Sequence, residues 1–518
     1  MSERLATDVI TLREAATFVR VSEKTMRELA RANKVPGQKV GREWRFLRSA
    51  LEAWLAHREP AGIVAEPDVQ YELPFTAKDA KPVTPGKLAT GFGDTAFTKN
   101  RNQPLHRWVP WIAGFSSSFV GSVLEAASEK EPRDVTVLDP FAGVGTTLVE
   151  AVERGHSAIG FEINPYAALV SRVKVQCPRY NLAKLKKLVH DFKQFMDSRT
   201  RAAPKSSPPA QFKSRVPFFS PKVERLVLHV LDFAGEQHEG WLRDVLRVAL
   251  GSVLVSFSNY SYEPSLGTRS AAGKDDVLEA DVASIVAAKL GEIACDVAQL
   301  QLRFASREQP PRAELFHESF LDGYANVPPR SVDFLITSPP YLNNYHYIRN
   351  TRPHLFWLGL VEHRAALKDM EQTSFGKFWQ TVRSGPEVPL DLACDGLPEQ
   401  LDELRGRNTE KGVYGGGGWA NYAVTYFNDC LRFCRAAHEI MAPGGAVVVV
   451  IGNNILQGIE FKTDEYFAQI AEQCGFERVE MHRVRKKRTG TSIIRSSVRM
   501  GDAKKRVELY ETAVELRA

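Results

Sequence analysis

The chain has 518 residues, of which 43% are hydrophobic and 25% are charged, as in an ordinary soluble globular protein with room for more than one folding unit. No run of about 18 apolar residues is present to span a bilayer, and charges interrupt residues 1–10 where a secretion signal needs an apolar stretch, so we expect a cytoplasmic protein. The net charge of +6 is mild, and six scattered cysteines without a C-x-x-C pair predict neither a disulfide framework nor a metal site.

Residues 1–58 have the pattern of a small helical module. Thr11 can cap a first helix, a turn follows at Val21–Ser22, and residues 23–32 form a second helix. Residues 39–46 suit a hairpin wing, and residues 48–57 look helical again. The stretch TLREAATFVRVSEKTMRELARANKVPGQKVGREWRFLRSALEAWL resembles the excisionase-type helix-turn-helix domain, which implies DNA binding. The residues expected to face DNA are Ser22, Lys24, Thr25, Arg27 and Arg31 on the second helix, and Arg42, Trp44 and Arg45 on the wing. A protein-docking role is the alternative for such a module.

After a linker rich in Pro, Gly, Ala and Thr at residues 59–98, residues 99–200 contain a strand, a glycine turn and a helix. The apolar run at residues 134–138 leads into DPFAGVGTT, where Gly143 and Gly145 let the backbone approach a ligand. The next strand, residues 157–161, ends in Glu162, whose carboxylate is placed to accept hydrogen bonds from ribose hydroxyls. The turn therefore predicts a nucleoside-binding site.

The residue types in and after this turn are more specific than the strand–turn–helix pattern alone. DPFAGVGTT followed by GFEINPYA resembles the cofactor site of the DNA amino-methyltransferase family, and it lacks the G-x-G-x-x-G of a dinucleotide binder. The resemblance implies an α/β, Rossmann-like fold with a mostly parallel seven-stranded sheet, and S-adenosylmethionine as cofactor. The residues implied at the cofactor are Asp139, Pro140, Phe141, Gly143, Gly145, Thr146, Thr147, Glu162 and Asn164. HRWVPWIAGFSSSFV, at residues 106–120, looks like the segment that closes over the cofactor in that family.

Two long segments have no counterpart in a minimal fold of this kind. Residues 201–310 have helical periodicity and form a predicted helical insertion, with an aromatic and polar loop at residues 258–270 as a candidate DNA contact. Residues 360–420 are expected to be irregular and are the rival for target recognition, with a hinge at Gly415–Gly418.

Residues 311–518 complete the predicted catalytic unit, with further strands expected at residues 476–484 and 507–516. Within it, SVDFLITSPPY runs an apolar strand straight into a diproline corner. Ser338, Pro339, Pro340 and Tyr341 resemble the catalytic motif of the same family, in the form more usual in enzymes that methylate cytosine N4 than adenine N6.

An exocyclic amine is a poor nucleophile, because its lone pair is delocalised into the base. Acceptors aimed at its protons, Ser338 Oγ and the Pro339 carbonyl, favour a pyramidal nitrogen, and Tyr341 would stack on a base flipped out of the duplex. The aromatic residues Tyr345 and Tyr347 are expected to contact DNA.

The resemblance implies a site-specific methyltransferase acting on double-stranded DNA, with a restriction endonuclease as a possible partner. The alternatives left open are an adenine N6 enzyme, an RNA methyltransferase and a DNA-binding regulator without catalysis. A cytosine C5 enzyme is excluded, because its chemistry needs a Pro-Cys nucleophile and the chain has no Pro-Cys dipeptide.

Overall fold

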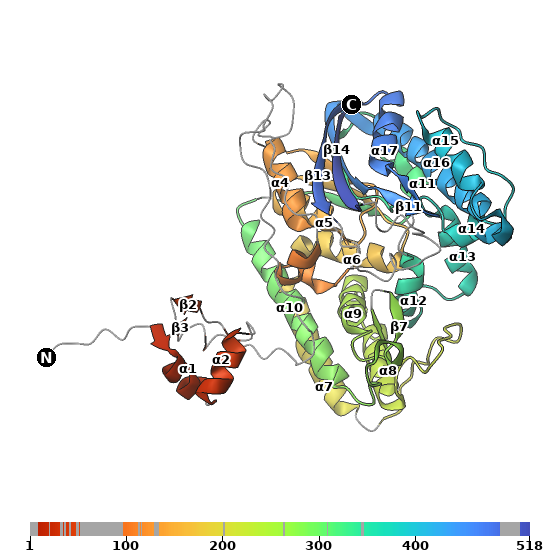
Figure 1. Ribbon diagram of the computed structural model, residues 1–518. Coiled ribbons are helices and arrows are strands. Elements are labelled where there is room, and N and C mark those ends of the chain that lie inside the picture. The colour runs from red at the N-terminus through yellow and green to blue at the C-terminus, as the bar shows by residue number, and fades with distance from the viewer. Residues whose placement is uncertain are drawn as a thin grey trace. The chain divides into compact units, whose positions relative to one another are not determined.

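Figure 1 shows the computed structural model of the chain. It describes residues 9–19, 21–31, 35, 38–40, 43–47, 51, 97–111, 114, 116–128, 134–199, 202–262, 265–307, 309–342, 346–486 and 508–518. These residues form two compact units, one within residues 1–83 and the other within residues 84–518. No helix in these ranges combines the length and the apolar character needed to cross a bilayer.

The described residues of the N-terminal unit include two helices, α1 and α2, and a three-stranded antiparallel sheet of order β1-β3-β2. Its elements are β1 (Val9–Thr11), α1 (Leu12–Val19), α2 (Glu23–Arg31), β2 (Gln38–Val40) and β3 (Glu43–Leu47). A capping box starts α1: Thr11 N donates to Glu14 Oε2 at 2.7 Å, and Glu14 N donates to Thr11 Oγ1 at 3.4 Å. The two expected helices and the wing are present, whereas the helix expected at residues 48–57 lies outside the described residues except for Leu51.

The larger unit is built on a seven-stranded sheet. Its strands are β4 (Thr136–Asp139), β5 (Ser157–Phe161), β8 (Ala313–Phe316), β9 (Val332–Thr337), β10 (Met441–Gly452), β13 (Glu477–Lys486) and β14 (Tyr510–Arg517). The order is β13-β14-β10-β9-β4-β5-β8. β14 runs antiparallel to both of its neighbours, β13 and β10, and the other neighbouring strands run parallel to one another. The mostly parallel seven-stranded sheet expected from the sequence is confirmed.

Helices cover both faces of this sheet. This agrees with β10, whose successive apolar side chains point to opposite faces and are buried on both. Val448 and Val450 belong to one hydrophobic cluster, and Val447, Val449 and Ile451 belong to the other. The first cluster includes residues of α4 (Ser117–Ser128), α5 (Thr146–Glu153), α6 (Pro165–Gln176) and α12 (Tyr347–Trp357). The second includes residues of α11 (Phe320–Gly323), α15 (Leu397–Arg405), α16 (Gly416–Ile440) and α17 (Thr463–Gln473). A short hairpin of β11 (Asn454–Leu456) and β12 (Ile459–Phe461) precedes α17.

A helical insertion separates β5 from β8 along the chain. It contains α7 (Leu182–Ser198), α8 (Pro221–Gly235), α9 (Gly240–Val253), the hairpin of β6 (Tyr260–Tyr262) and β7 (Leu266–Thr268), and α10 (Val282–Arg303). The long helices α7 and α10 pack side by side (Figure 1), so the helical layer begins before residue 201, the boundary expected from the sequence. Its apolar residues join the same cluster as α5 and α6, which makes one continuous core.

The segment at residues 360–420 is more regular than its sequence suggests. It contains α13 (Arg364–Thr373), α14 (Trp379–Val382), α15 and the 3-10 helix η6 (Thr409–Tyr414). The expected glycine hinge is wrong, because Gly416–Gly418 form the first turn of α16 and a Cβ on Gly416 or Gly418 would overlap a backbone carbonyl oxygen. The remaining 3-10 helices are η1 (Phe97–Asn102), η2 (His106–Trp108), η3 (Cys177–Arg179), η4 (Ser270–Ala272) and η5 (Tyr324–Asn326).

Candidate active site

The glycine turn and the diproline corner lie next to each other. The strands that lead into them, β4 and β9, are parallel neighbours, with Leu138 paired to Leu335. Thr337 Oγ1, at the end of β9, donates a hydrogen bond of 2.6 Å to Oδ1 of Asp139, at the end of β4. β5 continues the sheet on one side of β4, and β9 lies on its other side. This reversal of strand order is where open α/β sheets bind ligands beyond their carboxyl ends.

The two glycines of the turn have different tasks. Gly143 has φ +51°, lines a cavity and donates its N–H to Glu162 Oε2 at 2.9 Å. Gly145 has φ +83°, and a Cβ there would lie 2.6 Å from Ser171 Oγ on α6. The open space beside Gly143 fits the ligand contact that the sequence predicts, which stays a prediction, whereas Gly145 packs closely against a helix.

Two carboxyl groups face the turn, that of the buried Asp139 and that of the half-buried Glu162. Asp139 Oδ1 also accepts from Phe141 N at 3.0 Å, and burial raises the pKa of Asp139 to about 6. Glu162 Oε1 accepts from Asn164 N at 2.7 Å, and burial raises the pKa of Glu162 to about 7. Backbone N–H groups therefore orient the Glu162 carboxyl group toward the turn.

A cavity, called the rim cavity here, opens beyond the ends of these strands. Nine of the predicted cofactor and catalytic residues line it: Asp139, Pro140, Phe141, Gly143, Thr146, Glu162, Asn164, Ser338 and Pro340. Gly145, Thr147, Pro339 and Tyr341 are not among its lining residues. Both sequence motifs thus face one cavity.

Two of the predicted cofactor residues have structural bonds of their own. Asn164 Oδ1 caps α6 by accepting from Tyr166 N at 3.0 Å, and Asn164 Nδ2 donates to Thr351 Oγ1 on α12 at 2.8 Å. Thr147 Oγ1 donates to the Ile336 carbonyl at 3.3 Å, which ties α5 to β9. Thr147 therefore supports the turn from outside the cavity.

The diproline corner, the predicted catalytic corner, contains a hydrogen bond within the Ser-Pro-Pro-Tyr motif. Ser338 Oγ donates to Tyr341 Oη at 3.3 Å, and Tyr341 packs against the second hydrophobic cluster. Burial raises the pKa of Tyr341 well above its usual range, which keeps the phenol protonated. In this structure Tyr341 orients Ser338, and stacking of Tyr341 on a base stays a prediction.

Sequence reasoning missed one wall of the rim cavity. It comes from residues 371–378, and its members are Glu371, Ser374, Phe375, Lys377 and Phe378. Phe375 meets Phe141 edge-on with ring centroids 5.1 Å apart, and Phe378 lies 3.8 Å from the His346 ring. Gly376 N donates to Asp429 Oδ2 on α16 at 2.9 Å, which anchors this wall. The local sequence signal that could have indicated this wall is the pair of aromatic residues close to Gly376, Phe375 and Phe378.

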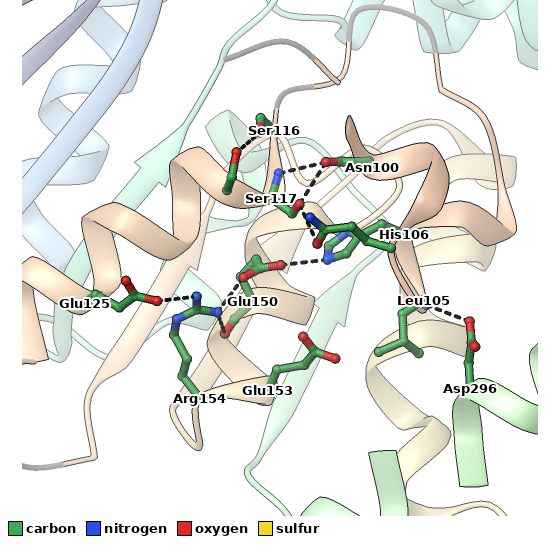
Figure 2. A network of polar contacts seen from close by, with 12 residues as sticks. Asn100, Leu105, His106, Ser116, Ser117, Glu125, Glu150, Glu153, Arg154 and Asp296 are labelled. Carbon is green, nitrogen blue, oxygen red and sulfur yellow. Dashed lines mark hydrogen bonds and ion pairs between the residues drawn. The ribbon is translucent and has the colours of Figure 1, made fainter. Parts of the chain in front are cut away.

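The segment before α4 supplies a further wall, and a polar network anchors it. Figure 2 shows His106 Nε2 donating to Glu150 Oε1 on α5 at 2.8 Å, and Leu105 N donating to Asp296 Oδ2 on α10 at 2.9 Å. Burial lowers the pKa of His106, so the imidazole is neutral at neutral pH. Trp111, farther along, lies over Gly143 and lines the rim cavity. The expected closing segment therefore does reach this cavity.

The predicted DNA-facing residues of α2 are only partly described. Ser22 Oγ accepts from Thr25 N at 3.0 Å and caps α2, so it has a structural task that the sequence reading did not assign. Thr25 and Arg27 are exposed. The side chains of Lys24 and Arg31 lie outside the description.

On the wing, Trp44 is half-buried against the small core and stacks on Phe46 with ring centroids 6.3 Å apart, so its ring is packed inward. Arg45 Nη1 donates to the Trp44 carbonyl at 3.1 Å. Arg42 and Tyr345 lie outside the described residues, whereas Tyr347 stacks on Trp111 with centroids 6.4 Å apart and planes at 15°.

Comparison with known proteins agrees with this geometry. Residues 98–172, which contain the closing segment, the glycine turn and Glu162, match the family model described as DNA methylase. Residues 9–59 match the family model of a helix-turn-helix domain. The chain is thus similar to DNA methylases over residues 98–172 and to helix-turn-helix domains over residues 9–59.

Curated relatives extend the similarity over most of the chain. Type II methyltransferase M.BsoBI of Geobacillus stearothermophilus is 21% identical over 435 residues, covering 77% of this chain and 83% of the relative. Type II methyltransferase M.AvaI of Nostoc sp. strain PCC 7120 is 24% identical over 407 residues, covering 74% and 81%. Type II methyltransferase M.MjaII of Methanocaldococcus jannaschii is 46% identical over 100 residues, covering 19% and 18%. The particular protein is therefore similar to type II methyltransferases well beyond its two motifs.

Proposed function

We propose that this protein transfers a methyl group from S-adenosylmethionine to the exocyclic amino group of a base flipped out of double-stranded DNA, with cytosine N4 as the acceptor. One observation carries the proposal: the glycine turn after β4 and the Ser-Pro-Pro-Tyr corner after β9 line one cavity. Ser338, as the first residue of that motif, favours cytosine over adenine.

The rim cavity suits this cofactor by charge. Four carboxyl groups line it, those of Asp139, Glu162, Glu318 and Glu371, and among the described lining residues Lys377 is the one Lys or Arg. S-adenosylmethionine carries a sulfonium and an ammonium group and, when bound, supplies an electrophilic methyl group. Glu162 would accept the ribose hydroxyls, and such donors favour its charged form. Asp139, Pro140, Phe141, Gly143, Thr146 and Asn164 would form the rest of the cofactor's surroundings.

The catalytic corner would act on the amino group through acceptors. Because Ser338 Oγ donates its proton to Tyr341, its lone pairs remain free to accept from an amino N–H. The Pro339 carbonyl is the second acceptor, and the fixed φ of Pro339 and Pro340 limits its drift. Holding both amino protons this way makes the nitrogen lone pair available for reaction.

The DNA partner is supported by the helix-turn-helix domain and by the type II relatives. Arg27 and Thr25, which are exposed on α2 of the N-terminal unit, would contact the duplex. Flipping the target costs about a few kcal/mol, which aromatic stacking by Tyr347 and its neighbours would offset. The same relatives support a restriction-modification setting with a cognate endonuclease.

The test is to incubate the full chain with labelled S-adenosylmethionine and DNA, digest the DNA to nucleosides and identify the labelled one. N4-methylcytosine is the expected product. N6-methyladenine would overturn the cytosine assignment and keep the reaction, and label in RNA but not in DNA would overturn the substrate. No transfer to any polymer would favour a DNA-binding regulator.

A further inference from the structure

A second cavity, called the insertion cavity here, lies where the helical insertion meets α6 and α12. Tyr166 of α6, Ser252 of α9, Tyr260 and Tyr262 of β6, and Asn350 and His354 of α12 are among its lining residues. Figure 1 shows α6, α9, β7 and α12 gathered in this part of the molecule. Nothing in the proposed reaction uses this cavity.

A stacked aromatic pair separates the two cavities. Trp111 and Tyr347 line both of them, with ring centroids 6.4 Å apart and planes at 15°. Ser338 and Pro340 line the rim cavity and are not among the lining residues of the insertion cavity. The insertion cavity is therefore a neighbour of the catalytic corner and not a part of it.

The two cavities differ in charge. Four carboxyl groups line the rim cavity, whereas the described lining of the insertion cavity has Arg101, Arg269 and Lys274 and includes no Asp or Glu. Arg269 is half-buried, and Lys274 is exposed. Cationic side chains along a cavity wall suit a phosphate group.

The inner wall suits a planar ring. Tyr166 stacks on His354 with centroids 4.3 Å apart, and Tyr166 is 1% exposed. Its Oη has no hydrogen-bond partner, although a buried hydroxyl without a partner is costly. Burial lowers the pKa of His354 to about 4, so this wall is uncharged at neutral pH. A nucleobase would offer both a face for stacking and an edge for the Tyr166 hydroxyl.

Gly251 leaves the space that the Tyr166 ring occupies in this wall. A Cβ on Gly251 of α9 would lie 2.6 Å from Tyr166 Cε2 and 2.9 Å from its Oη. The β6–β7 hairpin is held against α12, because Tyr262 Oη donates to the Asn350 carbonyl at 2.9 Å and Leu266 N donates to Asn350 Oδ1 at 2.7 Å. α12 is the next described helix after the Ser-Pro-Pro-Tyr motif along the chain.

We propose that the insertion cavity binds a nucleoside phosphate: a nucleotide of the bound DNA other than the one that is methylated. Its base lies against Tyr166, and its phosphate lies near Arg269 and Lys274. This inference rests on the proposed function, because DNA is its source of the nucleotide. It gives the helical insertion the task of holding a second unstacked nucleotide beside the target.

The test is photo-cross-linking of the full chain to a duplex that contains the sequence it methylates. A 5-iodo-pyrimidine replaces one nucleotide at a time on both strands, and mass spectrometry identifies the joined peptide. We expect a position other than the target to join Tyr166 or the β6–β7 hairpin. Cross-links to these residues from the target alone, or from no position, overturn the inference.

Variants give a second readout in DNA binding. Tyr166→Phe, which removes only the unpaired hydroxyl, is expected to weaken affinity for the cognate duplex by roughly 3- to 10-fold, as for one lost hydrogen bond. Lys274→Ala is expected to lower the slope of log affinity against log salt by about 1. Lys222→Ala is the matched control, because Lys222 is an exposed lysine of the same insertion outside the cavity. Equal effects of Lys274→Ala and Lys222→Ala overturn the phosphate assignment.

Two controls separate the sources and the hypotheses. Calorimetry measures binding of free deoxynucleoside 5′-monophosphates to the unaltered chain and to Tyr166→Phe. If the unaltered chain binds them, Tyr166→Phe does not, and no cross-links to DNA form, DNA is overturned as the source of the nucleotide. Methyl transfer to DNA by the unaltered chain is measured first. If that transfer occurs and the cross-links do not, this inference fails alone, whereas absence of transfer counts against the proposed function.

Discussion

Thr337 Oγ1 lies 2.6 Å from Asp139 Oδ1, and this hydrogen bond joins the carboxyl ends of two neighbouring strands, one from each half of the site. Asp139 is 1% exposed, and burial raises its pKa to about 6, so donors to its carboxylate carry unusual weight. Its other donors include Phe141 N, within the glycine turn. The bond therefore couples the shape of the turn to the strand that presents Ser338.

Thr337→Val should destabilise the protein by about 1–3 kcal/mol, because it leaves a buried carboxylate without one of its donors. The free energy of unfolding in urea measures this loss. Thr337→Ser keeps the hydroxyl and is the matched control. If the serine variant loses as much as the valine variant, packing of the methyl group and not the hydrogen bond is responsible.

Ser338→Ala should lower the single-turnover rate of methyl transfer by about 10²–10³, since it removes one acceptor from the amino group. The affinity for S-adenosylmethionine, measured by calorimetry, should stay within a factor of about two, because the proposed contact is to the target base. A rate close to that of the unaltered chain would contradict the catalytic role of Ser338.

The two glycines of the turn should respond differently to alanine. Gly145→Ala places a Cβ 2.6 Å from Ser171 Oγ at φ +83°, so thermal stability should fall. Gly143→Ala also carries the strain of φ +51°, but its nearest neighbour, Trp111 Nε1, is 3.5 Å away, so thermal stability should fall less than in Gly145→Ala and cofactor affinity should fall more. Melting temperature and cofactor dissociation constant are measured for both. The reverse pattern would show that the tasks of the two glycines are exchanged.

Glu153 should make stability depend on pH. Burial raises its pKa to about 7, despite the guanidinium of Arg303 at 3.1 Å, from an ordinary value of 4.5. Between these pH values the folded state binds more protons than the unfolded state, so this contribution to stability is full below pH 4.5 and is lost as pH rises through 7. Glu153→Gln should therefore gain about 1–2 kcal/mol relative to the unaltered chain between pH 5 and pH 8.

Urea unfolding at both pH values measures the Glu153 effect. Glu125→Gln is the control, because that side chain is 68% exposed and its charge pairs with Arg154 at the surface. A pH profile in Glu153→Gln parallel to that of the unaltered chain would assign the titration to another group.

Deletion of residues 1–58 should separate recognition from chemistry. We expect weaker affinity for duplex DNA, measured by fluorescence anisotropy, and an unchanged single-turnover rate at saturating DNA. Arg27→Ala in the full chain should weaken binding in the same direction, since Arg27 is an exposed cation of α2. Unchanged affinity after the deletion would favour a docking role for this unit.

The sequence predicted those parts of the site that short segments encode by themselves. An apolar run followed by DPFAGVGTT, or by SPPY, specifies a strand and the corner after it, because Gly and Pro restrict the backbone locally. The placement of both corners at one edge then followed from the fold that the resemblance implied.

The parts that the sequence did not predict depend on contacts between distant residues. Phe375 and Lys377 reach the rim cavity because Gly376 is anchored to Asp429, a bond that no local pattern encodes. Gly145 was assigned to the ligand because Ser171, its neighbour in space, is 26 residues away along the chain. Ser22 was assigned to DNA alone, although it also caps α2.

The helices of the insertion share one hydrophobic cluster with α5 and α6, and this limits how such a protein can diversify. Removal of α7–α10 would expose the apolar residues of α5 and α6 that pack against them, so these helices cannot be gained or lost as an independent unit. Change is more easily tolerated in the β6–β7 hairpin, where Tyr260 and Leu266 are the residues that pack with this cluster and two hydrogen bonds join the hairpin to Asn350 of α12. Engineering of altered sequence preference should therefore randomise this hairpin and leave the helices beneath it intact.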